Sequence, residues 1–232
     1  LYVRTGRPDE GYHIIQNVLE AHPGHGGALI SLLAYYETKR DRVQFERQFT
    51  AVMRSTEVLP RQKVAIFESM SRAVEAGQYD KYLLYRQVLR SALLNNRVDE
   101  ADSISAAGRR LHPEDLTFYY FGGLARLTMG HSAEAIALFH AALPHVTPES
   151  DSTLVSTVYT AIGDAQQGRG HLREAFAAYD TALIYDRNNV ECLNNYAYHL
   201  AVAGQRLHAA LRMAQRAVEI SPSEISYIDT YA

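Results

Sequence analysis

Apolar and small residues recur along the chain at the three- and four-residue spacing of an amphipathic helix, with short polar or proline-containing breakers between them. Four segments share one such helical pattern, and each carries an alanine near its fourth position. Successive alanines are separated by 34, 40 and 35 residues: Ala101, Ala135, Ala175 and Ala210. An earlier segment of the same kind ends in AHPGHGGALI (21–30), where Pro23 corresponds to Pro113 and Pro222. The pattern predicts an internal repeat.

A second helical pattern precedes these segments and ends in glycine. The stretches FYYFGGLARLTMG, VYTAIGDAQQGRG and CLNNYAYHLAVAG end at Gly130, Gly170 and Gly204. Glycine at this place is expected to cap a helix with a positive φ, and in ALISLLAYYETKR Arg40 takes its position. Inside the helices, Gly163 predicts a close contact between the two helices of a unit. Leucine there should overpack the contact, whereas alanine should be tolerated.

A unit of helix, tight turn, helix and breaker resembles the tetratricopeptide repeat (TPR), in which W-x-x-L-G-x-x-Y is followed by A-x-x-x-F and then P. The resemblance is closest at Tyr159, Ile162, Gly163, Gly170, Ala175, Tyr179 and Ala182. It is also good at Tyr119, Gly122, Gly123, Gly130, Ala135, Phe139 and Ala142. It covers most of the chain and implies an all-α fold, a TPR-like α-solenoid in which antiparallel helix pairs form a right-handed superhelix. About twelve or thirteen helices would result.

The resemblance makes 1–232 a single solenoid fragment with repeats of unequal quality. The predicted divisions are a truncated repeat at 1–25 that keeps its second helix, a degenerate repeat at 26–59, an atypical helical spacer at 60–81, repeats at 82–115, 116–149, 150–189 and 190–224, and the start of a truncated repeat at 225–232. An insertion around ESDSTL should lengthen one helix of the 150–189 repeat, and one residue is inserted between Gly204 and Ala210. Because the chain begins at Leu1 rather than methionine, we interpret it as a fragment.

Composition narrows the classes of function. The net charge is −3, and hydrophobic residues make up 47% of the chain, as in a folded globular protein. No apolar run approaches the roughly 18 residues of a membrane span, and no signal peptide is visible. Lysine occurs only at Lys39, Lys63 and Lys81, and no basic cluster predicts nucleic-acid binding.

No motif predicts catalysis, a cofactor or a metal. The ten histidines are scattered over different repeats, without the ligand spacing of a zinc site, so surface or packing roles are favoured. The single cysteine, Cys192, opens a helix and is interpreted as a small buried hydrophobe rather than a nucleophile. The glycines are spaced as helix caps and not as a phosphate-binding loop. We therefore predict that the chain is not an enzyme.

In the TPR family the first helix of each repeat lines a concave groove, and alignment carries groove positions onto this sequence. Arginines come first along the chain and carboxylates later. The candidate groove residues are Arg86, Arg90, Tyr120, Leu124, Leu127, Thr160, Asp164, Gln167, Glu191, Asn194, Tyr198 and Asp229. Such a face can bind an extended peptide or a partner helix; the alternative is a solvated face, with a ligand supplied elsewhere.

Three of these residues predict a polar pocket. Asn194 and Asp229 align at the same position of successive repeats, and Tyr198 lies one helical turn after Asn194. Packing requires none of these polar groups, so the pocket is expected to bind backbone amides or a basic side chain of a partner. A local alternative is that Asp229 ties Asn194 or Asn195 across the interface between repeats.

Two functions remain open at this stage. The first is a non-catalytic scaffold that binds a protein or peptide in the groove. The second is a structural subunit of a bacterial envelope complex, acting through homo-oligomerisation or terminal-helix contacts. It is suggested because LNNYAYHLAVAGQRLHAALRMAQRAVEISP resembles the C-terminal repeats of Gram-negative TPR proteins, many of them lipoproteins. That resemblance favours the envelope or periplasm over the cytoplasm. The basic residues that clamp chaperone tails in other TPR domains are not matched here.

Overall fold

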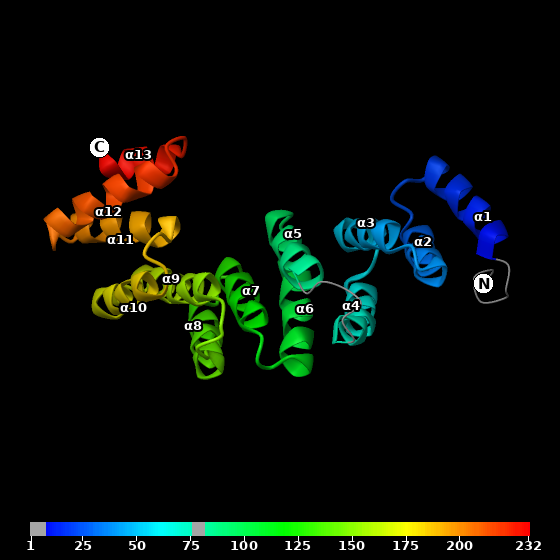
Figure 1. Ribbon diagram of the computed structural model, residues 1–232, viewed down its shortest axis with the longest axis horizontal. Helices are drawn as coiled ribbons and strands as arrows, with labels where there is room; N and C mark the ends of the chain where they lie inside the picture. Colours follow the sequence, from blue (N-terminus) through cyan, green and yellow to red (C-terminus); the bar gives the residue numbers. More distant parts are fainter. Residues whose placement is uncertain (1–7, 76–81) are drawn as a thin grey trace. The chain divides into compact units, whose positions relative to one another are not determined.

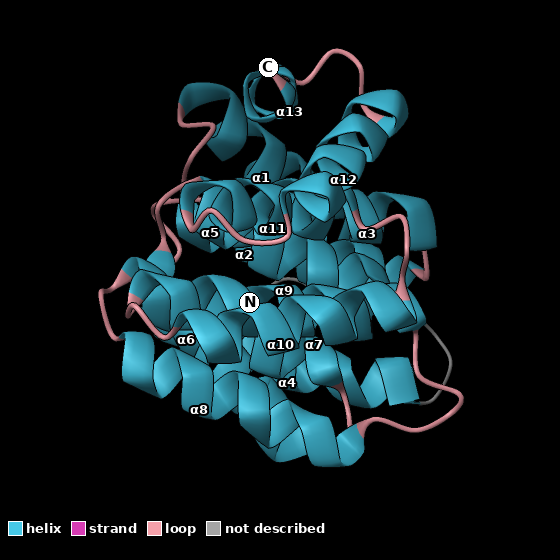
Figure 2. Ribbon diagram, turned by 90° about the vertical axis from the view of Figure 1, so that its left-hand side faces the viewer, coloured by secondary structure: helices cyan, strands magenta, loops and turns pink. Residues whose placement is uncertain are grey.

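The computed structural model describes residues 8–75 and 82–232, and these residues form thirteen α-helices and no β-strand (Figure 2). The prediction of an all-α helical-repeat fold is therefore confirmed. The chain divides into two compact units. We call them the N-terminal unit (Leu1–His112) and the C-terminal unit (Pro113–Ala232) and describe each by itself.

The C-terminal unit is a series of helix pairs, green to red in Figure 1. Its elements are α7 (Leu116–Thr128), α8 (Ser132–Ala142), a 3₁₀ turn (Leu143–His145), α9 (Ser152–Gly168), α10 (Leu172–Tyr185), α11 (Val190–Val202), α12 (Leu207–Ile220) and α13 (Ile225–Tyr231). Each odd-numbered helix packs on the even-numbered helix that follows it, and α7, α9, α11 and α13 also pack on one another in order. The first helices of successive pairs are therefore neighbours, which is the arrangement that a row of groove residues needs.

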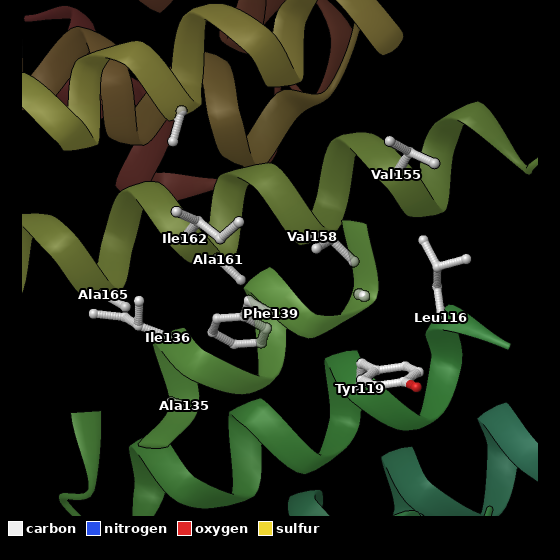
Figure 3. Packing of buried hydrophobic residues seen from close by; sticks show 12 residues of the cluster. Leu116, Tyr119, Ala135, Ile136, Phe139, Val155, Val158, Ala161, Ile162 and Ala165 are labelled. Carbon is white, nitrogen blue, oxygen red and sulfur yellow. The ribbon is translucent and has the colours of Figure 1, made fainter. Parts of the chain in front are cut away.

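Aromatic and small side chains fill the contacts between these helices. Phe139 of α8 is fully buried and faces Ala161 and Val158 of α9 (Figure 3). Burial of such a side chain stabilises the fold by about 1.5–3 kcal/mol. Tyr179 of α10 has the corresponding place in the next pair and is also fully buried. A single pair cannot cover such rings, so each ring holds its own pair and the next one together.

Gly163 makes the predicted close contact, but its expected tolerance of alanine is wrong. A Cβ atom on Gly163 would lie 2.6 Å from Cδ1 and 2.8 Å from Cζ of the Tyr179 ring. Gly123 faces the Phe139 ring in the same way. A helical φ alone suits alanine, but the buried ring of the partner helix leaves no room for a methyl group. Neither position therefore accepts any side chain without movement of an aromatic ring.

The predicted glycine caps are confirmed by their backbone angles. Gly130, Gly170 and Gly204 have φ values of 81°, 78° and 64°, and Arg40, which replaces glycine in the earlier pair, has a φ of 56°. The single inserted residue after Gly204 is absorbed by Arg206, which adopts a left-handed φ of 48° before α12 begins. The turn inside each of these helix pairs thus contains a left-handed residue, whether or not the sequence supplies glycine.

The insertion around ESDSTL lengthens a helix, as expected. Helix α9 has 17 residues, whereas α7 and α11 have 13 each. The rest of the insertion forms the loop before Asp151, whose side chain accepts hydrogen bonds from the backbone N–H groups of Thr153 and Leu154 at the start of α9. The extra turn leaves the contact face of α9 with Tyr179 unchanged, because the added residues lie at its N-terminal end.

The N-terminal unit is less regular. Its elements are α1 (Pro8–Ala21), α2 (Gly26–Lys39), α3 (Arg42–Arg54), α4 (Pro60–Glu75), a π-helical segment (Tyr82–Gln87) that continues directly into α5 (Val88–Leu94), and α6 (Val98–Leu111). Helix α2 pairs with α3, and α4, the helix of the predicted spacer 60–81, packs on α6. Residues 76–81 of that spacer lie outside the described part. The repeat boundaries proposed from the sequence stay predictions.

A buried ionic cluster joins α4 to α6. Lys63 is fully buried, and its Nζ donates to the two carboxylate oxygens of Glu100, at 3.0 and 2.7 Å, and to the carbonyl of Ser55 at 2.6 Å. Arg97 donates to Glu100 Oε2 at 3.0 Å and to the carbonyl of Met53. Two cations therefore share one carboxylate, and both also hold carbonyls at the C-terminal end of α3. Nothing in the repeat pattern predicted this cluster.

Candidate functional site

The carboxylate of Asp164 joins three helices of the C-terminal unit. Asp164 is on α9, and its Oδ1 accepts a hydrogen bond of 2.6 Å from the hydroxyl of Tyr179 on α10. The Nδ2 of Asn195 on α11 donates to the same carboxylate, at 3.1 Å to Oδ1 and 3.3 Å to Oδ2. The helix spacing places Asp164 on the face of α9 next to α11, one turn after Thr160. The candidate groove residue Asp164 thus lies within a polar network.

Every hydrogen-bond partner of this carboxylate is electrically neutral. Burial raises the pKa of Asp164, although the hydrogen bonds from Tyr179 and Asn195 and the nearby His199 favour its charged form. Burial also lowers the pKa of His199, whose ring stacks on Tyr179 with a centroid distance of 6.3 Å. In the described part of the chain, no lysine or arginine lies within ion-pair distance of Asp164. The site therefore contains a half-buried negative charge without a cation.

A second carboxylate adds to the negative potential of this face. Burial raises the pKa of Glu191, at the start of α11, and the charge of Asp164 raises it further. Tyr227 on α13 is close enough for Glu191 to raise its pKa in turn, after the effect of burial. On this face Asp164 thus disfavours the ionisation of Glu191, and Glu191 disfavours the ionisation of Tyr227.

The three residues of the predicted polar pocket have different surroundings. Asn194 is half-buried, and its Nδ2 donates to Asn195 Oδ1 at 3.3 Å. Its own Oδ1 is buried and has no hydrogen-bond partner among the described residues. Tyr198 is 51% exposed and touches the ring of His199 edge-on at 5.2 Å. Asp229 is exposed on α13. Within the described chain no hydrogen bond joins Asp229 to Asn194 or Asn195; Asp164 ties Asn195 instead.

The remaining candidates occupy other places. Tyr120 and Leu124 on α7 are half-buried and pack against the apolar cluster around Phe139, so part of their surface serves the core. Gln167 on α9 is half-buried. In the N-terminal unit, Arg86 is half-buried and Arg90 is exposed beside a cavity between α3 and α5. The structure therefore gathers Asp164, Glu191, Asn194 and Tyr198 on two adjoining helices, α9 and α11.

The sequence prediction does not include three residues of the site in the roles that the structure gives them. Asn195 and His199 are not among the predicted groove positions, and Tyr179 is predicted only as a position of the repeat pattern. A signal existed for Tyr179, because a fully buried tyrosine hydroxyl needs a hydrogen-bond partner. That partner is Asp164, which was already a candidate. Asn195 gave no such signal, because its neighbour Asn194 occupies the aligned groove position.

The chemistry available elsewhere is limited. Cys192 is completely buried, and burial raises the pKa of its thiol to about 12, which makes it a poor nucleophile. Among the described residues no group of three or more histidine, cysteine, aspartate or glutamate side chains could hold a metal ion. None of the described helices is both long and apolar enough to cross a bilayer.

Comparison with known proteins supports the fold. No protein-family model and no curated protein matches the chain by sequence. Solved structures do match. A chain of the "APC/C hetero-tetramer Cut9-Hcn1" aligns with 99% of this chain at 16% identity and a TM-score of 0.55. This chain spans 46% of the length of that one. MamA aligns with 81% of this chain, over 96% of its own length, at 13% identity and a TM-score of 0.53.

PilF of Pseudomonas aeruginosa aligns with 98% of this chain, over 90% of its own length, at 16% identity and a TM-score of 0.51. These neighbours are TPR proteins. At such low identity the likeness shows the fold and not the function. The helix pairs, the small-residue contacts and these structural neighbours together show that the chain has the helical-repeat fold of TPR proteins.

Proposed function

We propose that the chain is a non-catalytic scaffold for a protein or peptide partner, and that Asp164 and Glu191 of the C-terminal unit bind a basic side chain of that partner. The observation that carries the proposal is the carboxylate of Asp164, which is half-buried and has only neutral hydrogen-bond donors. A buried charge without an opposite charge reduces the stability of a fold. A cationic ligand would remove that penalty, because it pairs with the charge in place.

The hydrogen-bond acceptors of this face favour the same kind of partner. The carboxylates of Asp164 and Glu191 accept hydrogen bonds when ionised. The buried Oδ1 of Asn194 is also an acceptor, and it receives no hydrogen bond from the described residues. A peptide supplies the matching donors, the ammonium or guanidinium group of a basic side chain and its own backbone N–H groups. The exposed ring of Tyr198 offers a surface on which a lysine or arginine side chain can lie. Arg86, Arg90, Tyr120, Leu124, Gln167 and Asp229 stay predictions as further groove residues.

The test uses matched pairs of short extended peptides, fluorescently labelled, in which one position is arginine or its uncharged analogue citrulline. We expect the chain to prefer the arginine member of the best pairs, with binding that weakens as sodium chloride is added. Asp164→Asn keeps the shape of the side chain and both hydrogen-bonded neighbours. It should weaken the arginine peptides about tenfold while citrulline peptides are unaffected.

The matched control is Glu174→Gln, which removes an exposed carboxylate of α10 in the same unit. It should leave binding unchanged. If Asp164→Asn binds the arginine peptides as well as the parent, the proposal is wrong. If Asp164→Asn unfolds more easily and still binds, the carboxylate is part of the structure and not of a binding site.

Assembly is the second candidate function, and exposed apolar side chains on α12 and α13 favour it. These side chains are Leu207, Leu211, Ile225, Ile228 and Tyr231, each at least 43% exposed. Exposed apolar side chains that form one patch mark protein contacts. Sedimentation velocity over a range of concentrations tests it: a monomer at every concentration would exclude self-association, and Leu211→Glu with Ile225→Glu should abolish any dimer that forms.

A further inference from the structure

A cavity of about 540 Å³ lies between α3 and α5 of the N-terminal unit, both labelled in Figure 1. Its floor is apolar and is built from Met53 and Val88, which are buried, while Leu94 stands at its edge with 76% of its surface exposed. Two arginines line it, Arg54 from the last turn of α3 and Arg90 from α5. The other described lining side chains, those of Thr50, Gln87, Ser91 and Asn95, are neutral and polar, and none of them is a carboxylate.

Both arginines of this cavity are available to a ligand. Arg54 and Arg90 are exposed, and within the described chain neither has an ion pair or a hydrogen bond to another side chain. Some other arginines of the described chain are paired, as Arg97 is with Glu100, Arg126 with Glu134 and Arg206 with Asp180. A guanidinium group presents five donors in a fixed fork that suits carboxylates and phosphates. The cavity therefore carries ten such donors, and no carboxylate is among the described residues of its walls.

The groups behind the cavity wall preserve this positive potential. The C-terminal end of a helix normally attracts cations and repels anions, because its last carbonyls are unpaired. At the end of α3 two of these carbonyls are already occupied: Arg97 donates to the Met53 carbonyl, and Lys63 donates to the Ser55 carbonyl. Among the described residues, Glu100 is the one counter-ion of Lys63 and Arg97. At this end of α3 an anion in the cavity thus meets an excess of positive charge, because the nearby cations already occupy two of the terminal carbonyls.

We propose that this cavity binds an acidic peptide segment, with side-chain carboxylates on Arg54 and Arg90 and a neighbouring aliphatic side chain on Met53, Val88 and Leu94. A peptide fits better than a small anion because the cavity is open. Sites for small molecules bury most of their ligand's surface, whereas here Leu94 and both arginines face solvent. The segment would extend beyond the cavity along the helices. This site is separate from the carboxylate face of the C-terminal unit, and either proposal can fail without the other.

The test measures binding of the full chain to an N-acetylated, C-terminally amidated peptide of alternating glutamate and leucine, by fluorescence anisotropy. The blocked ends ensure that only side-chain carboxylates are present. A glutamine–leucine peptide of the same length is the uncharged probe, and inorganic phosphate is the small-anion competitor. We expect binding of the glutamate peptide alone, with phosphate competing only weakly.

The decisive variants are Arg54→Gln and Arg90→Gln, singly and together, with Arg47→Gln as the matched control. Arg47 is an exposed arginine of the same helix α3 that does not line the cavity. The double variant should bind the glutamate peptide at least about tenfold more weakly, and the control should stay within about twofold of the parent. Arg54→Lys with Arg90→Lys keeps the charge without the fork, and we expect an intermediate loss.

Three outcomes would overturn the proposal. The first is a double variant that binds like the parent. The second is an equal loss in Arg47→Gln, which would mean that the peptide senses only the general charge of α3. The third is full displacement by phosphate at concentrations that leave the folded chain intact, which would make the site one for small anions. Since Arg54 and Arg90 have no partners in the described structure, thermal unfolding of the double variant should match the parent and exclude misfolding as a cause.

Discussion

Two carboxylates, one in each unit, have opposite surroundings. They are Glu100, which is buried, and Asp164, which is half-buried. Glu100 of the N-terminal unit accepts hydrogen bonds from Lys63 and Arg97, so its negative charge meets two cations inside the fold. Asp164 of the C-terminal unit accepts them from the hydroxyl of Tyr179 and the amide of Asn195, which carry no charge. Folding alone neutralises the first carboxylate. The second keeps its charge unpaired.

The difference separates a structural charge from one that a partner can use. Breaking a buried ion pair leaves the remaining charge uncompensated, so a residue such as Glu100 is required for stability. The charge of a carboxylate that lacks a nearby cation does not stabilise the fold. It resembles the binding residues of other proteins, which often reduce stability in exchange for function. Substitutions can test whether Glu100 is a structural charge and Asp164 a charge that a partner can use.

Glu100→Gln should have the largest effect. The substitution leaves Lys63, which is fully buried, and Arg97 without a counter-charge, and it should lower the free energy of unfolding of the N-terminal unit by about 3–5 kcal/mol. Urea unfolding followed by circular dichroism measures the loss. Glu134→Gln removes an exposed partner of Arg126 and should cost at most about 1 kcal/mol. Equal effects of the two substitutions would place Glu100 among ordinary surface charges.

Gly163→Ala tests the contact that holds Tyr179 against Asp164. The added methyl group would overlap the buried ring, so the free energy of unfolding should fall by about 1–3 kcal/mol, and Gly163→Leu should cost more. The control is Gly168→Ala, at the end of the same helix, where a Cβ would meet nothing within 4 Å. An unchanged melting temperature for Gly163→Ala would show that the ring moves aside freely and that Asp164 is less firmly positioned than the structure indicates.

The helix caps give a smaller difference between the same two units. Arg40 holds a left-handed conformation that glycine adopts without strain, and its side chain is exposed. Arg40→Gly should therefore stabilise the N-terminal unit by about 1 kcal/mol, and Gly170→Ala should destabilise the C-terminal unit by a similar amount. Differential scanning calorimetry detects both shifts. A loss of stability in Arg40→Gly would mean that the arginine side chain contributes more than its backbone strain removes.

Asp164→Asn should have the smallest effect and the opposite sign to Glu100→Gln. Burial raises the pKa of Asp164, so the folded chain holds this proton to a higher pH than the unfolded chain does. The associated stability is fully present below the ordinary pKa of 3.8 and is lost as the pH rises through the raised value. Asparagine removes that loss. The variant should be more stable than the parent at neutral pH.

The pH dependence distinguishes this effect from a simple change in packing. The gap between the urea midpoints of Asp164→Asn and the parent should narrow as the pH falls toward 3.8, because the parent carboxyl then becomes neutral as well. A variant that is less stable than the parent at neutral pH would place Asp164 in the same class as Glu100, and the comparison between the two carboxylates would no longer hold.

The sequence by itself determined the fold class and its local rules. Apolar residues at helical spacing, the alanines from Ala101 to Ala210 and the glycines at 130, 170 and 204 are sufficient to predict helix pairs and their ends. These features are readable because they depend on neighbours a few residues apart, where backbone geometry fixes the contact. The longer α9 followed from the same local count. The candidate groove positions came from alignment to a repeat, and they include Asp164, Glu191 and Asn194.

Only the tertiary structure decided which of these residues meet and what each charge experiences. Lys63 and Glu100 are 37 residues apart in the chain, and Asp164 and Asn195 are 31 apart. No local pattern links such residues, because the distance between them depends on how whole helices pack. The same holds for Gly163, whose φ permits alanine while the ring of Tyr179 forbids it. Burial, the presence or absence of a counter-ion and the space around a side chain are properties of the packed helices, and a repeat pattern specifies them only where every repeat packs alike.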